Sequence, residues 1–292
     1  MATDNDKNER IWTIACVDGS RYSTSVRDHA IWLSQVLNAP FKALHAIEHN
    51  PNVAVSDLTG AIGLGAQEHL LSELTELEQQ RNKLEIQKGR QMLETVKVHA
   101  EQAGIEHPTL VQRHGSLIES LIDLENDARV IVVGIRGEVH EDNNQHLGAH
   151  LESLVRSVNR PFLVVNREFT PPKAAMLAYD GSSCCLKGLE MVKNSPLFDH
   201  LPVHLVNVSG DLDKAQVLVA QAKQVLEGAG RTVHTAVLQG LPHEALCQYQ
   251  KENEIDLTVM GAFSHNRLRE LVFGSFTIRM LLNTEKPLLL LR

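Results

Sequence analysis

The sequence predicts an α/β protein in which two similar domains follow one another along the chain. Two observations carry this prediction. The tripeptide Asp-Gly-Ser follows an apolar, strand-like run at residues 18–20 and again at residues 180–182, an offset of 162. After each of these points, strand-like runs alternate with helix-like segments. Such alternation is typical of parallel strands joined by right-handed crossover helices.

The repeat extends beyond the tripeptide. Pro40 opens the run PFKALHAI and Pro202 opens PVHLVNV at the same offset of 162. Later in the chain the offset falls to about 126, as three further matches show: Gly104 with Gly230, Gly148 with Gly274, and Pro161 with Pro287. The first copy therefore carries about 36 additional residues between its second strand and its second helix.

The sequence pattern of each copy predicts five strands separated by four helices. A domain boundary is expected at Thr170-Pro171-Pro172, because two adjacent prolines continue neither a helix nor a central strand. The predicted domains are residues 1–169, with an insert near residues 50–84, and residues 173–292.

Composition and charge narrow the function classes. The 292 residues are 43% hydrophobic and 22% charged, as in a globular protein of two ordinary domains. The charged N-terminus lacks a signal-like apolar stretch and no run approaches the ~18 apolar residues of a membrane span, so we expect a cytoplasmic protein with no membrane partner. Residues 1–172 hold 16 Lys and Arg against 24 Asp and Glu, and residues 173–292 hold 12 against 12, which argues against nucleic acid as a partner.

The stretch LTVMGAFSHNRLRELVFGSF, residues 257–276, predicts an anion-binding turn. An apolar strand ends at Gly261, Ser264 follows it, and Gly274-Ser275 precedes a helical segment that begins near Phe276. A glycine lets a phosphate approach the backbone, and a helix start offers free N–H groups and a positive dipole end. The alternative is a strand-to-helix turn that needs small residues for its geometry alone.

The spacing G-x2-S-x9-G-S of this stretch closely resembles the G-x2-G-x9-G-(S/T) signature of the universal stress protein family, many members of which bind ATP there. Ser264 departs from the signature at its second glycine. The resemblance covers both copies and nearly the whole chain apart from the insert. It implies, for each copy, a doubly wound five-stranded parallel sheet with helices on both faces, of the nucleotide-binding α/β type. It also implies that the two domains pair with each other.

The resemblance further implies which residues bind the ligand. Asp18 and Asp180 match the aspartate that contacts the adenosine moiety, although Asp-Gly-Ser is equally good helix-capping chemistry. We expect binding at Asp180 and capping at Asp18. The site expected in the second copy comprises Asp180, Val208, Gly261, Ser264, His265, Gly274, Ser275 and Phe276. A weaker, degenerate site in the first copy comprises Asp18, Ala46, Gly134, Gly137 and Gly148.

The glycine loop of the first copy departs further from the signature. Ten residues rather than nine separate Gly137 from Gly148, and Ala149 stands at the Ser/Thr position. Three carboxylates in the loop, those of Glu138, Glu141 and Asp142, would repel a polyphosphate unless a metal ion lay between them. A competing hypothesis is a metal site formed with His140, His146 and His150, but no fourth ligand is fixed, so we predict no metal site.

The insert has two parts. VSDLTGAIGLG is apolar and small enough to fold over a pocket mouth or against the other domain. After it, Leu70, Leu74, Leu77 and Leu84 form a narrow helical stripe that is interrupted by Arg81 and then shifts to Ile86, Leu93, Val96 and Ala100. The shift predicts a helix whose N-terminal end leaves the sheet. Its stripe packs within the chain or, alternatively, forms a coiled-coil-like homodimer contact.

The function predicted from these observations is a stress-response module that binds ATP or a related adenine nucleotide, with or without Mg²⁺, most strongly in the second copy. Two alternatives remain open, a slow nucleotide hydrolase and a structural adaptor that binds nothing. Only His265 lies where a general base would be needed, and the sequence contains no G-x4-G-K-(S/T) loop, G-x-S-x-G elbow or H-E-x2-H pair. The pattern therefore favours a binding module over an enzyme.

Overall fold

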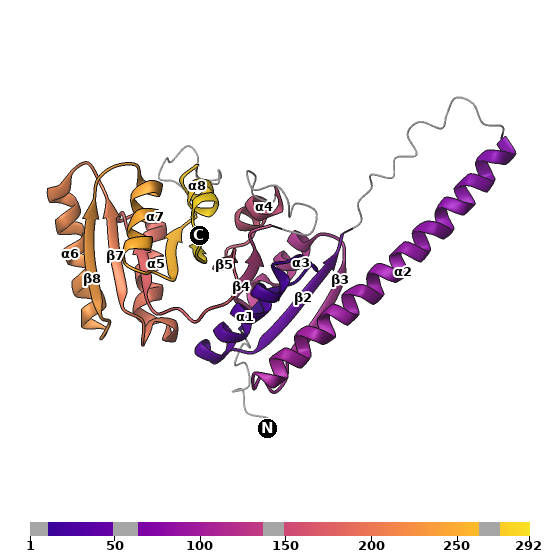
Figure 1. The fold of residues 1–292 in the computed structure, drawn as a ribbon, viewed down its shortest axis with the longest axis horizontal. Coiled ribbons are helices and arrows are strands. Elements are labelled where there is room, and N and C mark those ends of the chain that lie inside the picture. The colour runs from indigo at the N-terminus through magenta and orange to yellow at the C-terminus, as the bar shows by residue number, and fades with distance from the viewer. Residues whose placement is uncertain (1–10, 49–63, 137–148, 263–274) are drawn as a thin grey trace, which may run out of the picture.

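A computed structural model describes residues 11–48, 64–136, 149–262 and 275–292 of the chain. Strands and helices alternate along these residues, and the sheet is flanked by helices, so the predicted α/β fold class is confirmed (Figure 1). The described strands form one sheet of ten, in the order β3-β2-β1-β4-β5-β10-β9-β6-β7-β8. Its first five positions come from the N-terminal repeat and its last five from the C-terminal repeat.

The N-terminal repeat is a parallel five-stranded unit. Its elements are β1 (Trp12–Cys16), α1 (Ser23–Leu37), β2 (Phe41–Ile47), α2 (Leu64–Gln102), β3 (Thr109–His114), α3 (Leu117–Leu124), η1 (Glu125–Asp127), β4 (Ala128–Gly134), α4 (Ala149–Ser157) and β5 (Phe162–Val165). Each neighbouring pair of strands within it runs parallel.

The C-terminal repeat has the same order of elements and the same parallel pairing. Its elements are β6 (Ala175–Ala178), α5 (Ser183–Asn194), η3 (Pro196–Phe198), β7 (Val203–Val208), α6 (Leu212–Gly228), β8 (Val233–Leu238), α7 (Pro242–Glu252), β9 (Leu257–Gly261), α8 (Ser275–Asn283) and β10 (Leu288–Leu291). The domain limits at residues 169 and 173 stay a prediction.

Both faces of the sheet are buried, which explains why the central strands lack a polar alternation. One apolar cluster joins the sheet to α1, α2, α5 and α6, and a second joins its other face to α3, α4, α7 and α8. In β10, Leu289 and Leu291 belong to the first cluster and Leu288 and Leu290 to the second. Four consecutive leucines are therefore compatible with a single short strand.

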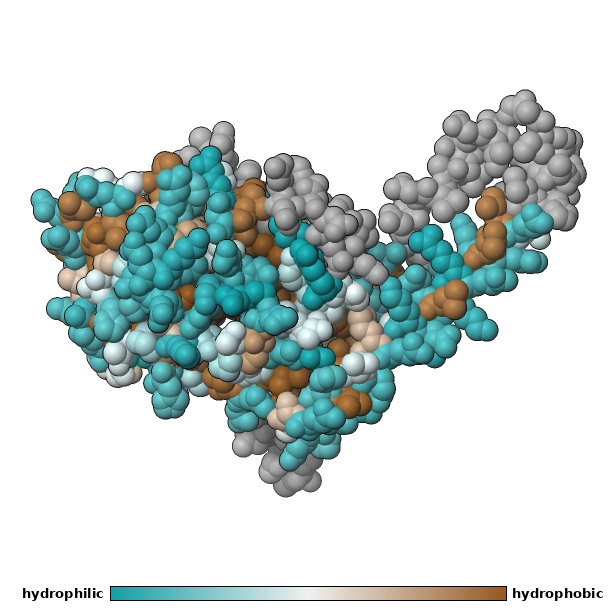
Figure 2. All heavy atoms as spheres, viewed as in Figure 1, coloured by the Kyte–Doolittle hydropathy of each residue, from teal (hydrophilic) through white to brown (hydrophobic). Residues whose placement is uncertain are grey.

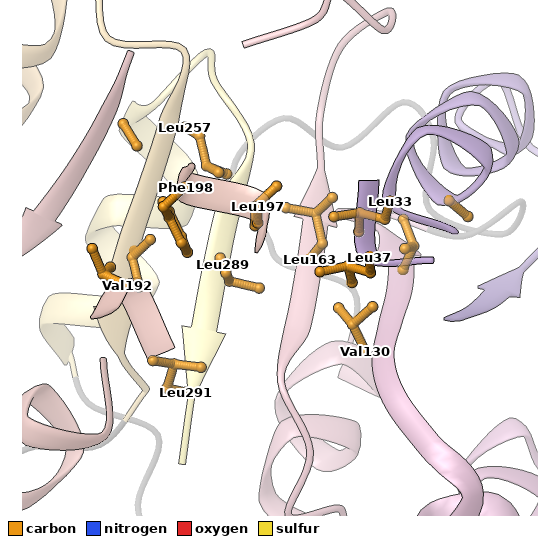
Figure 3. Packing of buried hydrophobic residues seen from close by; sticks show 14 of the residues in the cluster. Leu33, Leu37, Val130, Leu163, Val192, Leu197, Phe198, Leu257, Leu289 and Leu291 are labelled. Carbon is orange, nitrogen blue, oxygen red and sulfur yellow. The ribbon is translucent and has the colours of Figure 1, made fainter. Parts of the chain in front are cut away.

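The two repeats meet where β5 pairs antiparallel with β10, Leu163 opposite Leu289. A terminal strand that remained unpaired would expose N–H and C=O groups, and here each of the two strands covers the other. Leu197 of η3 extends from the C-terminal repeat toward Leu163 and Leu37 of the N-terminal repeat (Figure 3). Hydrogen bonds cross the junction in both directions, from Asn166 Nδ2 to the Thr284 carbonyl (2.7 Å) and from Arg292 to the Arg156 carbonyl.

The segment that connects the repeats lies against α1. Ser25 Oγ donates a hydrogen bond to the Arg167 carbonyl, and the Phe169 ring meets the His29 ring edge-on with centroids 4.9 Å apart. His29 is buried, and its Nδ1 donates to the Ser25 carbonyl at 2.8 Å. The connection is therefore attached to the N-terminal repeat by polar and aromatic contacts.

Helix α2 is 39 residues long and projects from the body of the protein (Figure 1). Leu93, Val96 and Ala100 near its C-terminal end are buried against the sheet, as the shifted stripe predicted. Leu77 and Leu84 of the projecting part are exposed, so they are not packed within the described chain, and brown patches lie among hydrophilic residues along this part of the helix (Figure 2). Among the described helices, including this one, none is both long and apolar enough to cross a membrane.

Candidate functional site

The carboxyl ends of β6, β7 and β9 converge at one edge of the sheet. β6 lies between β9 and β7, and the chain leaves it in one direction for β7 and returns on the other side as β9. The gap between β6 and β9 is therefore the point where the strand order reverses. Open α/β sheets bind ligands in the crevice outside such a point. Asp180, Val208 and Gly261 follow or end these three neighbouring strands, as the sequence predicted.

Asp180 is held in a tight turn after β6. Its Oδ1 accepts a hydrogen bond from the Ser182 backbone N–H at 3.0 Å, and Gly181 adopts φ of 78°, which a residue with a side chain rarely adopts. The helix that follows is capped by Ser182, whose Oγ accepts from Cys185 N at 3.2 Å. Because Ser182 provides the cap, the exposed Asp180 carboxylate remains at the sheet edge.

Cys185 contributes a neutral group to this edge. Burial, and to a smaller extent the charge of Asp180, raises the pKa of the Cys185 thiol to about 12. The thiol donates a hydrogen bond to the Ala178 carbonyl at 3.3 Å. It therefore stabilises the end of β6 and supplies no thiolate nucleophile.

Gly261, at the end of β9, is required by helix packing. A Cβ atom at this position would lie 2.8 Å from the Cβ of Cys184 in the first turn of α5, closer than two carbon atoms can approach. The next residue, Ala262, donates its N–H to the Leu291 carbonyl at 2.8 Å and accepts a hydrogen bond from Thr277 Oγ1 at 3.0 Å. These bonds fix the start of α8 beside the end of β9, where Ser275 is exposed and Phe276 is half-buried.

The corresponding edge of the N-terminal repeat has Asp18 after β1. Its Oδ1 accepts hydrogen bonds from the Ser20 N–H and the Ser23 hydroxyl, both at 3.0 Å. The N-cap residue of α1 is Tyr22, without a side-chain cap bond, so the expectation that Asp18 caps this helix is wrong. The carboxylate stabilises the turn ahead of the helix instead, and it is half-buried.

Tyr22 covers the end of β4 in this repeat. A Cβ atom on Gly134 would lie 2.9 Å from the Tyr22 Cβ. The Tyr22 hydroxyl accepts hydrogen bonds from Arg21 Nη2 at 2.8 Å and from Arg136 Nη1 at 3.2 Å. The ring is buried and therefore extends across the strand end from Gly134 toward Arg136.

Two residues at equivalent positions of the repeats lie on the neighbouring strands β2 and β7. His45 on β2 donates from Nδ1 to the Val17 carbonyl at 2.9 Å, and Asn207 on β7 donates from Nδ2 to the Tyr179 carbonyl at 2.7 Å. Each bond fixes the residue before the aspartate. Ala46 and Val208, which were both predicted as site residues, directly follow these two residues and are half-buried.

Several predicted site residues lie outside the described residues, namely Ser264, His265, Gly274, Gly137 and Gly148. So do His140 and His146 of the alternative metal hypothesis. Among the residues that the structure describes, no group of three or more His, Cys, Asp or Glu side chains could hold a metal ion.

Comparisons with known proteins agree with this geometry. The sequence profile described as "Universal stress protein family" matches residues 13–166 and 209–292. A universal stress protein of Synechocystis sp. is 38% identical over 283 residues, which cover 96% of this chain and 99% of the relative. The chain belongs to the universal stress protein family. Both matched segments lie in the repeats described above, so it is a tandem universal stress protein.

Solved structures of universal stress proteins share this fold. One from Archaeoglobus fulgidus superimposes with a TM-score of 0.72 at 19% identity and covers 98% of this chain and 99% of its own. A solved universal stress protein in complex with cAMP is 18% identical, covers 41% of this chain and 98% of its own, and has a TM-score of 0.36.

Three contributors to the candidate site were not found from the sequence: the pair of Tyr22 and Cys184, the hydroxyl of Thr277, and the pair of His45 and Asn207. The first pair carried a usable signal, because the two residues are 162 apart, as the two Asp-Gly-Ser turns are. Thr277 is equivalent to Leu151 at the later offset of 126, so this position is polar in one repeat and apolar in the other.

Proposed function

We propose that this universal stress protein binds ATP or a related adenine nucleotide at the carboxyl ends of β6, β7 and β9. The C-terminal repeat would bind it more tightly than the N-terminal repeat, and its occupancy would be passed to a partner as a stress signal. In this proposal residues 1–169 and 173–292 act as two paired domains in a cytoplasmic protein.

One observation carries the preference for the C-terminal repeat. The side chain that lies against the strand-end glycine is Tyr22 in the N-terminal repeat and Cys184 in the C-terminal repeat. The tyrosine ring is buried at the strand end, whereas the cysteine ends at its sulfur. The aspartates differ in the same direction, because Asp18 is half-buried and bonded to Ser23, while Asp180 is exposed. Among the described residues, less side-chain bulk therefore lies over the strand edge in the C-terminal repeat.

The described residues of this edge suit the three parts of a nucleotide. The Asp180 carboxylate can accept hydrogen bonds from ribose hydroxyls, and the half-buried Val208 offers an apolar surface for the base. Ser275 opens α8 with an exposed hydroxyl at the positive end of the helix, which favours phosphate. Within the proposal, Ser264, His265 and Gly274 complete the phosphate-binding turn.

The first experiment is calorimetric titration of ATP into the wild-type protein and the variant Asp180→Asn, with Asp18→Asn as the matched control. Asparagine keeps an oxygen that can accept from the Ser182 N–H, so the turn is retained. A hydrogen bond to a charged group contributes about 1.5–3 kcal/mol, which predicts roughly a tenfold or greater loss of affinity for Asp180→Asn. Unchanged binding in Asp18→Asn is expected. The opposite pattern would assign the ligand to the other repeat.

The second experiment transfers the tyrosine. Cys184→Tyr should fold, because the N-terminal repeat accommodates Tyr22 against the equivalent glycine. We expect it to abolish ATP binding, while Cys184→Ser binds as the wild type does. Titrations with and without Mg²⁺, and with cAMP in place of ATP, define the ligand. Absence of nucleotide binding in every titration would favour the structural adaptor, and phosphate release from bound ATP would favour the slow hydrolase.

A further inference from the structure

The projecting part of α2 presents apolar side chains to solvent. Leu77 is 61% exposed, Leu84 is 65% exposed, and Val98 is 41% exposed two heptads after Leu84. Leu74 is half-buried and lies at the N-terminal end of the same stripe. Most helical stability in proteins comes from packing of an apolar face against other parts of the structure. Among the described residues, nothing packs on the exposed leucines of the projecting part, so this face lacks there the contact that would stabilise the helix.

The exposed stripe points away from the body of the protein. At 3.6 residues per turn, Leu77 and Leu84 lie ~20° apart around the helix axis. The sheet-facing residues Leu93 and Val96 lie ~180° and ~120° from Leu84 by the same geometry. A second helix can thus lie along the stripe without displacing α2 from β2 and β3.

The stripe has the spacing of a short coiled coil. Positions 74, 77, 81 and 84 alternate steps of three and four residues, and Arg81 is the polar member. A polar residue at such a position weakens the contact but selects register and partner. A helical partner is therefore indicated.

Charge along the same segment identifies that partner. Residues 72–80 contain three acidic residues, Glu73, Glu76 and Glu78, and no basic residue. Residues 81–90 contain four basic residues, Arg81, Lys83, Lys88 and Arg90, against the single acid Glu85. The two halves of one helix are therefore complementary in charge to the opposite halves of an identical helix running the other way.

We propose that the projecting part of α2 is a dimerisation surface for a second copy of this chain, packed as an antiparallel pair of helices. The register centred on residue 79 places Leu74 opposite the partner's Leu84 and Leu77 opposite the partner's Arg81. It also places Arg81 beside the partner's Glu78. A twofold axis perpendicular to the helices generates this isologous contact, as in most homodimers.

A parallel arrangement of the same helices is disfavoured by charge. It would set Arg81 against its own copy in the apolar seam and the acidic segment 73–78 against another acidic segment. Like charges at these flanking positions repel. In the antiparallel register the acidic segment 73–78 instead lies opposite residues 80–85, which include the basic residues Arg81 and Lys83.

The first test measures the mass of the full chain by sedimentation equilibrium over a dilution series. The wild type should approach twice the monomer mass, and the combined variant Leu77→Glu, Leu84→Glu should remain a monomer. The control Ser72→Glu, Gln79→Glu adds the same charge on exposed positions of the opposite helix face and should dimerise as the wild type does. Matching far-ultraviolet circular dichroism in all three proteins shows that folding is retained.

The second test separates orientation from simple association. A chain with Glu73, Glu76 and Glu78 changed to Lys and a chain with Arg81, Lys83 and Lys88 changed to Glu should each be monomeric and should form a mixed dimer when combined. Spin labels at Gln80→Cys should lie close together in the dimer, whereas labels at Arg90→Cys should be separated by about 33 Å along the helix axis. Both substitutions are made with Cys184 and Cys247 replaced by Ser.

Three results would overturn the proposal. A wild-type chain that stays monomeric at every concentration would mean that another part of the same chain occupies the stripe. A dimer that survives Leu77→Glu, Leu84→Glu would place the interface elsewhere. Equal short distances from both spin-label positions would show a parallel pair and refute the antiparallel register. Nucleotide titration of the monomeric variant is independent of all these outcomes.

Discussion

The N-terminal and C-terminal repeats have the same strand order but differ at the start of the first helix. The N-terminal repeat has Arg21, Tyr22 and Ser23 there, and the C-terminal repeat has Ser183, Cys184 and Cys185. In the first, the Ser23 hydroxyl bonds to Asp18 and Tyr22 covers the end of β4. In the second, Cys185 bonds to the Ala178 carbonyl and Asp180 remains exposed.

This difference separates two roles of the strand-end glycine. A Cβ atom at Gly134 or at Gly261 would lie less than 3 Å from a Cβ atom at the start of the first helix of its repeat, so both glycines are needed for packing whether or not a ligand binds. The glycine is therefore a property of the fold. Space for a ligand depends on the size of the residue that lies against it, and in this respect the repeats differ.

The largest effect that would sharpen the comparison is on stability. Tyr22→Ala removes a buried ring and its two hydrogen bonds, which should cost about 3–5 kcal/mol of unfolding free energy. Cys184→Ala removes one half-buried sulfur and should cost less than about 1 kcal/mol. Denaturant titration followed by circular dichroism gives both values.

Tyr22→Phe is the matched control, because it keeps the ring and removes only the hydroxyl. Its cost should lie between those of the other two variants. Equal costs for Tyr22→Ala and Cys184→Ala would mean that the ring does not cover the strand end, and the structural basis for preferring the C-terminal repeat would be lost.

The fold was largely predictable from the sequence because local patterns specify it. Asp-Gly-Ser after an apolar run, matching prolines before the second strands, and four consecutive leucines in β10 each constrain a turn or a buried strand without reference to distant residues. The shift of the stripe from Leu84 to Ile86 likewise indicated where α2 leaves the sheet.

The site was less predictable because its differences arise from contacts between distant segments. Nothing local to Gly134 shows that Tyr22 lies against it, since the two residues are 112 positions apart in the sequence. Asp18 illustrates the same limit. The sequence around Asp18 suits a helix cap. In the structure, however, the Ser23 hydroxyl bonds to the Asp18 carboxylate, and α1 begins without a cap from Asp18. The other repeat has a cysteine at the position of Ser23.

The second effect concerns the two glycines. Alanine at Gly134 would meet both the Tyr22 Cβ at 2.9 Å and the Arg136 carbonyl oxygen at 3.1 Å, whereas alanine at Gly261 would meet the Cys184 Cβ at 2.8 Å and nothing else within 3.8 Å. Overpacking of this kind costs about 1–3 kcal/mol, and Gly134→Ala should be the more costly because backbone is involved.

A double-mutant cycle tests the contact directly. Cys184→Gly removes the atom that Gly261→Ala would strike, so the double variant should be more stable than the sum of the single effects by about 0.5–3 kcal/mol. Strict additivity would mean that these two positions do not touch.

The smallest expected effect is on the pH dependence of stability, to which a histidine of each repeat contributes by a different amount. Burial lowers the pKa of His29 in the N-terminal repeat, and it also lowers the pKa of His204 in the C-terminal repeat, where His234 adds to the shift. A histidine whose folded pKa is lowered binds fewer protons folded than unfolded. Its stabilising contribution is therefore present above the ordinary value of 6.5 and is lost as pH falls below that value.

His29 should dominate this dependence, because it is 2% exposed and supports the segment between the repeats through Phe169, whereas His204 is half-buried. The midpoint temperature of thermal unfolding should decrease as the pH is lowered from about 7.5 to about 5.5. His29→Asn, which keeps a donor near Nδ1, should reduce this decrease more than His204→Asn does. Differential scanning calorimetry measures both midpoints. The ring centroids of His204 and His234 lie 4.8 Å apart. If His204→Asn reduced the decrease of the unfolding temperature more than His29→Asn, the contact between these two histidines would govern the acid response. The connection between the repeats would then not govern it.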